Sequence, residues 1–262
     1  MKEIHPTAIV EDGARLGANV RIGPFSIIGP EVVLGDGVVV DSHVVITGHT
    51  HIGARTEIHS FAAIGGSPQD LSYKGEPTSV VIGAHCMIRE HVTIHRGTVR
   101  GKKQTTVGAH CFLMVGTHVA HDCRLGDHVM LVNNATLGGH VEIGEFAILG
   151  GLAAIQQRTR IGAHAFIGGL TGVSTDVIPF GMALGDRAEL GGLNIVGMKR
   201  RGFDRPAIHA LRSAYQEIFA EDKTFAERLE HVATKFADVP AVMMMVDFIR
   251  EGGDRPLCKP RD

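Results

Sequence analysis

Residues 119–144 read VAHDCRLGDHVMLVNNATLGGHVEIG, and an aliphatic side chain occupies every sixth position. The register runs through Val119, Leu125, Leu131, Leu137 and Ile143. A six-residue period is too short for a helix pair or a propeller blade, but it fits one short strand and one turn. Three such units make a triangular coil whose aliphatic side chains point inward and stack from coil to coil. The stretch therefore predicts a parallel β-helix.

The same period extends over most of the chain, and we assign residues 1–190 to the coil. The other aliphatic positions are Ile4, Val10, Leu16, Ile22, Ile28, Leu34, Val40, Ile46, Ile52, Ile58, Ile64, Ile82, Ile88, Ile94, Val107, Leu113, Leu149, Ile155, Ile161, Ile167 and Val173. Two polar segments near 65–79 and 95–106 break the register, so we expect external loops there. Glycines such as Gly35 and Gly144 follow the aliphatic residue, and we expect them to supply the turn conformations.

Residues 191–262 lose the six-residue period and are predicted to form a small helical domain. Asp204 is a candidate N-cap two residues before Pro206. Thr224 and Glu227 have the spacing of a capping box. A third helix is expected over about 240–250, and the residues past Gly252 are expected to form a loose tail.

Composition limits the classes of partner. The net charge is −2, which gives no bulk attraction for nucleic acid or an anionic membrane. No run of about 18 apolar residues is present, so we expect no membrane insertion. The first residues contain no apolar signal-peptide core, and no cysteine belongs to a CxxC pair. We therefore expect a cytoplasmic protein with reduced thiols.

One column of the predicted coil gathers polar groups. Residues 18 apart stack in adjacent coils, roughly 4.8 Å from one another. His121 then stacks with Gly139, and Gly139 with Gln157. His118 lies three residues before His121, and His140 lies next to Gly139. An imidazole, a glycine N–H and a glutamine amide therefore share one column.

This column has the parts of an acyl-transfer site. His121 can remove a proton from a hydroxyl near pH 7, and Asp122 can fix its tautomer. The Gly139 N–H can stabilise a tetrahedral oxyanion. The sequence contains no nucleophilic Ser or Cys elbow, so direct attack by the acceptor is favoured over a covalent acyl-enzyme.

Several motifs carry a family resemblance. They are Gly23-Pro24-Phe25, Gln69-Asp70-Leu71, Gly75-Glu76-Pro77-Thr78, Ile88-Arg89-Glu90, Thr93-Ile94-His95-Arg96-Gly97-Thr98, His118 to Cys123, Asn133 to Leu137, and Asn194 to Phe203. Over essentially its whole length the chain resembles the UDP-N-acetylglucosamine acyltransferases, which belong to the hexapeptide-repeat acyltransferases. The resemblance implies a left-handed coil, a sense that periodicity alone does not give.

The resemblance also implies roles. Members transfer a 3-hydroxyacyl chain from acyl carrier protein to the 3-position of UDP-N-acetylglucosamine, the first step of lipid A biosynthesis, without a cofactor or metal. They are homotrimers with the site between subunits. The catalytic group would be His121, Asp122 and Gly139. Contacts to the sugar nucleotide would come from Gln69, Asp70, His118, His140 and Gln157. The diphosphate end of the nucleotide would be held by Asn194, Arg200 and Arg201. Gly169 would be the ruler for acyl-chain length.

Three positions depart from the family pattern, and four alternatives stay open. Ser72, Gln156 and Val196 stand where relatives often have Lys, His and Glu, which affects nucleotide binding and acceptor choice. The acceptor could be a 3-amino analogue of the sugar, or the chain could be the related N-acyltransferase. His118 and His121 could instead bind zinc, as in hexapeptide-repeat carbonic anhydrases. A non-catalytic scaffold with surface histidines is the remaining alternative.

Overall fold

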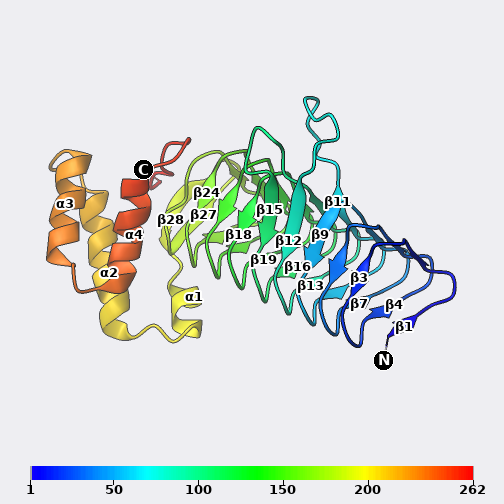
Figure 1. The fold of residues 1–262 in the computed structure, drawn as a ribbon. Helices are drawn as coiled ribbons and strands as arrows, with labels where there is room; N and C mark the ends of the chain where they lie inside the picture. Colours follow the sequence, from blue (N-terminus) through cyan, green and yellow to red (C-terminus); the bar gives the residue numbers. More distant parts are fainter. Residues whose placement is uncertain (1, 262) are drawn as a thin grey trace.

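The computed structural model describes residues 2–261. The chain winds into stacked triangular coils with a helical bundle at the C-terminal end of the stack (Figure 1). Within residues 2–261 the strands form three sheets of 11, 9 and 8 strands, here called sheets A, B and C. Each sheet takes every third strand of the coil, so neighbours in a sheet come from successive coils. All pairings are parallel except the last one in sheet A, between β27 and β28.

The strands are short, and most have two residues. Sheet A contains β1 (Glu3–Ile4), β4 (Arg21–Ile22), β7 (Val39–Val40), β10 (Glu57–Ile58), β13 (Met87–Ile88), β16 (Phe112–Leu113), β19 (Met130–Leu131), β22 (Ile148–Leu149), β25 (Phe166–Ile167), β27 (Gly181–Leu184) and β28 (Glu189–Leu193). Sheet B contains β2 (Ile9–Val10), β5 (Ile27–Ile28), β8 (Val45–Ile46), β11 (Ala63–Gly66), β14 (Thr93–His95), β17 (His118–Val119), β20 (Thr136–Leu137), β23 (Ala154–Ile155) and β26 (Gly172–Val173). Sheet C contains β3 (Arg15–Leu16), β6 (Val33–Leu34), β9 (His49–Ile52), β12 (Ser79–Ile82), β15 (Gln104–Val107), β18 (Arg124–Leu125), β21 (Glu142–Ile143) and β24 (Arg160–Ile161).

The core follows the six-residue period. In β8 the side chain of Ile46 is fully buried, whereas that of Val45 points outward and is 38% exposed. Strand residues alternate in direction, so each two-residue strand gives one side chain to the interior and one to the surface. The inward side chains stack through pairs such as Leu137 with Ile155. The expected inward positions are therefore confirmed from Ile22 to Val173, whereas Ile4 in the first strand is 41% exposed.

The glycines after the aliphatic residues have a different role from the one expected. Gly35, Gly53 and Gly144 do not have positive φ. A Cβ added to Gly35 or Gly144 would lie 2.7 or 2.4 Å from a backbone nitrogen of the next coil. These residues are glycine because successive coils approach closely there, so the expectation that they supply turn conformations is wrong.

The left-handed turn conformations belong to larger residues at the corners of the triangle. We name the corners AB, BC and CA after the sheets that they join. At corner CA the side chains form an aromatic column whose ring centroids are 4.5 to 5.1 Å apart. Its members are His85, His110, His128, Phe146, His164 and Phe180. All six have positive φ. Ring stacking thus accompanies a backbone conformation that side chains rarely adopt.

Two loops leave corner BC, close to where they were expected. The first joins β11 to β12 over 67–78 and projects away from the coil (Figure 1). The second joins β14 to β15 over 96–103. Both interrupt the period between sheets B and C, so they stand at the same corner of successive coils.

The C-terminal helices are α1 (Ile195–Arg200), α2 (Arg205–Ile218), α3 (Phe225–Lys235) and α4 (Pro240–Glu251). Asp204 caps α2, and Thr224 with Glu227 forms the expected capping box of α3. The prediction of a loose tail is wrong, because Asp176 and Leu190 form bridges with Leu257 and Pro260. No helix within residues 2–261 is long and apolar enough to cross a membrane.

Candidate active site

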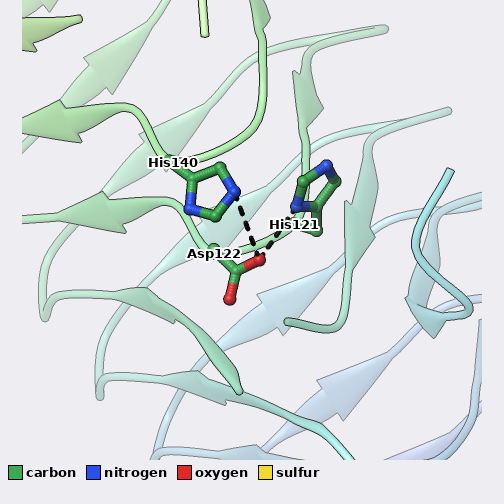
Figure 2. A group of neighbouring side chains, drawn as sticks. All are labelled: His121, Asp122 and His140. Carbon is green, nitrogen blue, oxygen red and sulfur yellow. Dashed lines mark hydrogen bonds and ion pairs between the residues drawn. The ribbon is translucent and has the colours of Figure 1, made fainter. Parts of the chain in front are cut away.

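The centre of the predicted site lies at corner BC, directly after β17. His121 Nδ1 is 2.9 Å from Asp122 Oδ2, and the His121 side chain is 15% exposed. Figure 2 shows that the rings of His121 and His140 both face the Asp122 carboxylate. Two successive coils therefore supply the three side chains, as their near-18-residue spacing predicts.

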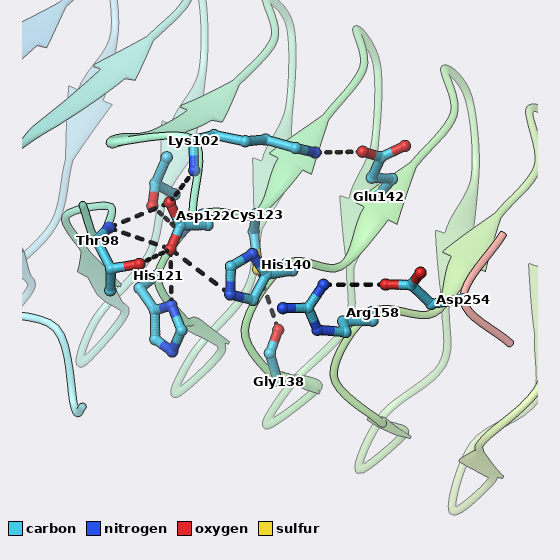
Figure 3. A network of polar contacts seen from close by, with 11 residues as sticks. Thr98, Lys102, His121, Asp122, Cys123, Gly138, His140, Glu142, Arg158 and Asp254 are labelled. Atoms are coloured by element: carbon cyan, nitrogen blue, oxygen red, sulfur yellow. Dashed lines mark hydrogen bonds and ion pairs between the residues drawn. The ribbon is translucent and has the colours of Figure 1, made fainter. Parts of the chain in front are cut away.

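Asp122 is the fixed point of this group. It has a φ of 61° and is fully buried. Its carboxylate accepts hydrogen bonds from the Thr98 N–H at 3.1 Å, the Thr98 hydroxyl at 2.7 Å and the Lys102 N–H at 2.7 Å (Figure 3). Burial alone would raise the pKa of Asp122, but the hydrogen bonds from His121, Thr98 and Lys102 lower it to about 2. The carboxylate is therefore ionised at neutral pH, and it can orient the imidazole and stabilise its protonated form.

Sequence reasoning missed Thr98 and Lys102 as site residues. Both belong to the loop 96–103, which folds back onto corner BC. The Lys102 ammonium also pairs with Glu142 of β21, which fixes the loop to sheet C. The motif Thr93-Ile94-His95-Arg96-Gly97-Thr98 pointed to this segment, but the coil period does not show where a loop folds.

Gly139 lies beside His121 in the next coil. A Cβ added to Gly139 would be 2.5 Å from His121 Cε1 and 2.6 Å from Nε2. Only a glycine leaves room for the imidazole at this place. The backbone hydrogen bonds within residues 2–261 do not use the Gly139 N–H, whereas the neighbouring Gly138 and His140 N–H groups donate to Ile155 and His121. The Gly139 N–H thus has no backbone acceptor within these residues.

Two further histidines flank the pair. His140 Nε2 is 3.8 Å from Asp122 Oδ2, and its ring stands edge-on to that of His121 at 5.1 Å. His118 Nδ1 bonds the Thr93 hydroxyl at 2.7 Å. Burial lowers the pKa of both His140 and His118 below the usual value for histidine. Both rings are therefore neutral at pH 7 and can donate and accept hydrogen bonds to a polar ligand.

His95 belongs to one of the sequence motifs, but the sequence did not predict a role for it. Its ring stands edge-on to that of His118 at 5.2 Å, and burial lowers its pKa. His95 Nδ1 is buried without a hydrogen-bond partner within residues 2–261. The residue extends the imidazole group along sheet B.

The loop 67–78 brings Asp70 within electrostatic range of His121. Asp70 Oδ1 accepts a hydrogen bond from the Ser72 N–H at 2.8 Å. This bond is the main cause that lowers the pKa of Asp70, and the proximity of His121 and Arg100 lowers it further. Gln69 is exposed beside it. Both predicted contact residues thus stand at corner BC.

Gln157 completes the predicted column two coils beyond His121. It is exposed, and its backbone carbonyl accepts two hydrogen bonds from the Arg255 guanidinium at 3.1 and 3.2 Å. Asp254 pairs with Arg158 at 2.9 Å. The C-terminal tail therefore holds the end of the column in place.

The remaining predicted residues lie at other corners. Asn194 Oδ1 accepts the Gly197 N–H at the start of α1, and its Nδ2 donates to the His164 carbonyl. Arg201 binds the Phe146 carbonyl at corner CA, and Arg200 is exposed beside it. Gly169 lies at corner AB, between β25 and β26. One chain therefore does not bring Arg200 and Arg201 to the corner that holds His121.

The side chains of His121, Asp122 and His140 are also candidates for a metal site. One ligand atom each of His121, Asp122 and His140 lies within 4.8 Å of the others. The Asp122 carboxylate already accepts hydrogen bonds from Thr98, Lys102 and His121. A metal ion would have to displace one of these donors, so the geometry favours a His–Asp pair over a metal centre.

Comparisons with known proteins show what the chain is similar to. A family model described as UDP N-acetylglucosamine O-acyltransferase, domain 2, matches residues 176–258, and a bacterial transferase hexapeptide model matches residues 104–139. The acyl-(acyl-carrier-protein)–UDP-N-acetylglucosamine O-acyltransferases of Azorhizobium caulinodans and Bartonella tribocorum are both 52% identical, over 98% and 99% of this chain and 95% and 96% of theirs.

Solved structures agree as well. The LpxA structure from Acinetobacter baumannii superposes with a TM-score of 0.94 at 41% identity, over 97% of this chain and 99% of that chain. The UDP-N-acetylglucosamine acyltransferase of Francisella novicida gives 0.95 at 34% identity, over 99% and 95%. The expected fold class, a left-handed parallel β-helix followed by a small helical domain, is confirmed.

The close contact between Gly139 and His121 predicts that a larger residue at position 139 displaces the imidazole. Gly139→Ala should push the His121 ring away from its place beside Asp122 by about 1 Å, since carbon atoms do not approach below about 3.5 Å without repulsion. A crystal structure of the variant measures the shift. Gly151→Ala is the matched control, because its Cβ would find its nearest atom at 3.4 Å. An undisplaced His121 ring in folded Gly139→Ala would contradict the prediction.

Proposed function

The chain belongs to the UDP-N-acetylglucosamine O-acyltransferase family and is an acyltransferase, and we propose that it transfers a 3-hydroxyacyl chain from acyl carrier protein to the 3-position of UDP-N-acetylglucosamine. This reaction is the first step of lipid A biosynthesis. The observation that carries the proposal is the 2.9 Å contact between His121 and the buried, ionised Asp122, beside the unused Gly139 N–H. Together they supply a base, its partner and an oxyanion donor.

The steps follow from the protonation states. Asp122 holds the proton of His121 on Nδ1, so Nε2 is free to accept the proton of the acceptor hydroxyl. The oxygen attacks the thioester carbonyl, and the Gly139 N–H stabilises the tetrahedral oxyanion. The intermediate then expels the carrier's thiolate, which takes the proton back from His121. The bond made is an ester and the bond broken is a thioester, so the step needs no cofactor.

The base can be tested by replacing it. His121→Ala should lower turnover by about 10²- to 10⁴-fold, the usual contribution of a positioned base. The measurement is the rate of product formation by mass spectrometry, with acyl carrier protein thioesters and with the 3-hydroxy and 3-amino sugar nucleotides offered separately.

His59→Ala is the matched control, because His59 Nδ1 pairs with Asp41 at 2.8 Å at corner AB. It should keep turnover close to that of the native protein. Near-native turnover in His121→Ala, or an equal loss in both variants, would remove His121 from the chemistry.

We also propose that the active protein is a homotrimer with the site shared between subunits. The support is the placement of the predicted ligands: His121, Asp70 and Gln157 stand at corner BC, whereas Arg200 and Arg201 stand near corner CA. The core of the coil separates these corners, so one substrate molecule cannot contact both within one chain. A neighbouring subunit that places its corner CA against corner BC would complete the site.

Mixing of inactive variants tests the shared site. Mixed trimers of His121→Ala and Arg200→Ala chains, which are each inactive or weak alone, should regain up to about a third of native activity, since one of the three interfaces in each closed ring then pairs an intact corner BC with an intact corner CA. Two affinity tags isolate the mixed species before the assay. Mixed trimers with no recovered activity would place the whole site within one chain.

Gly169 is proposed as the ruler of acyl-chain length. Its φ is not positive, and the left-handed position at corner AB belongs to Leu170 with a φ of 62°. A turn therefore does not require glycine at 169. Sheet B joins this corner to corner BC, and its outward residues Thr136, Ala154 and Gly172 are small. A groove along this face would run from His121 toward Gly169.

Substitution of Gly169 tests the ruler. An added Cβ would lie 3.2 Å from the Gly151 carbonyl oxygen, which a small shift can relieve. Gly169→Met should move the preferred donor to a chain several carbons shorter, and excluding about three methylenes should change relative kcat/KM roughly 50-fold. Gly169→Ala should give an intermediate profile. Competition assays with mixed donors measure it, and an unchanged profile in folded Gly169→Met trimers would refute the role.

A further inference from the structure

The α1 segment rests on one end of the aromatic column. Phe203, which follows α1, places its ring edge-on to His164 at 5.2 Å and to Phe180 at 5.5 Å. His164 is itself stacked between Phe146 and Phe180, at 5.0 and 5.1 Å. We call Phe146, His164 and Phe180 the platform. Edge-on and stacked rings are the favoured arrangements of aromatic pairs, so the contact has a defined geometry.

Polar contacts fix the same segment. The Asn194 side chain joins the start of α1 to the His164 carbonyl at 3.0 Å, and Met198 within α1 is fully buried. The backbone of Asn194 also donates to the Phe180 carbonyl at 2.7 Å. Both amide atoms of Asn194 are therefore occupied within the chain, which makes this residue a link between α1 and the platform.

Arg201 is held by Phe146 through two separate interactions. Its Nη2 donates to the Phe146 carbonyl at 2.7 Å, and its guanidinium lies 5.2 Å from the centre of the Phe146 ring. Burial lowers the pKa of Arg201. Arg201 and Arg200 line a cavity of about 440 Å³ together with Asn194 and Val196. Phe146 thus positions Arg201, which forms part of the wall of this cavity.

We propose that Phe146 and His164 are positioning residues for the sugar nucleotide, because they place α1 and the two arginines. The proposal rests on the proposed function for the identity of the ligand. Phe146 acts through Arg201, and His164 acts through Asn194 and Phe203. Neither residue takes part in the proton transfers at His121, which belong to another corner of the coil.

The imidazole of His164 serves as a flat, uncharged ring in this arrangement. Its Nδ1 is buried without a hydrogen-bond partner within the described residues. Burial and the charge of Arg201 lower the pKa of His164 to about 4. The ring is therefore neutral at physiological pH, and a phenyl ring should replace it. This property separates a stacking role from a hydrogen-bonding or acid–base role.

The experiment compares Phe146→Leu with Phe146→Tyr. Leucine fits the backbone, since Leu152 and Leu170 have φ values of 60° and 62° at corner AB, close to the 58° of Phe146. Loss of the ring should raise the KM for UDP-N-acetylglucosamine and the Kd for UDP by roughly 2- to 30-fold, with kcat within about 2-fold. Phe146→Tyr and His164→Phe should keep both constants near native values.

Phe61→Leu is the matched control. Phe61 has a φ of 66° and stacks between His43 and His91 at 5.1 Å, and no arginine lies over its ring within residues 2–261. It should leave the KM and Kd unchanged. Melting temperatures and light scattering of each variant report folding and assembly.

The outcomes separate the two proposals. An unchanged Kd for UDP in folded Phe146→Leu would contradict the positioning role of the platform. An equal rise in Kd in Phe61→Leu would also contradict it, because the effect would then come from a general destabilisation of the coil. A native protein that binds UDP but does not acylate UDP-N-acetylglucosamine would refute the proposed function. The Kd values for UDP of the variants, measured by calorimetry, would still decide the role of Phe146.

Discussion

Direct stacking of each coil on the next is the constraint from which the other features follow. Within the coil each strand pairs in parallel with its counterpart one coil away, so outside the two loops a residue and its successor 18 positions on occupy one column. Where coils approach most closely a side chain cannot fit, and glycine is required, as at Gly35 and Gly144. The repeat is thus stable as an array, because each coil satisfies the backbone groups of its neighbours.

The contact between His121 and Asp122 shows how such an array can hold a buried charge. A carboxylate removed from water is costly unless it is paired and hydrogen-bonded. Asp122 meets this requirement through Thr98, Lys102 and His121, and two of these donors belong to a loop that leaves the coil. A regular coil offers its backbone groups to adjacent coils and has few donors to spare. The loop 96–103, which interrupts the period, therefore supplies the hydrogen-bond donors to Asp122 that regular stacking cannot supply.

The period explains what the sequence could and could not reveal. Stacking at 18 residues placed His121, Gly139 and Gln157 in one column, and it correctly gave the inward side chains. It could not show that loop 96–103 folds onto Asp122, because loop conformation depends on contacts outside the repeat. It also could not show the tail bridges at Asp176 and Leu190 or the engagement of Asn194 and Arg201 with corner CA. These contacts join segments distant in the chain, without a periodic signal.

The triangular section has a further consequence for how a site can be built. Each corner is separated from the others by the packed core, so groups at two corners of one chain cannot meet around a small molecule. The proposed base, His121, stands at corner BC, the arginines stand near corner CA, and Gly169 stands at corner AB. A rigid coil cannot bend to close this distance, because packed interiors are not continuously deformable. The proposed juxtaposition of corners from different subunits would bring the proposed base, the cationic residues and the proposed acyl groove together without distorting the stack.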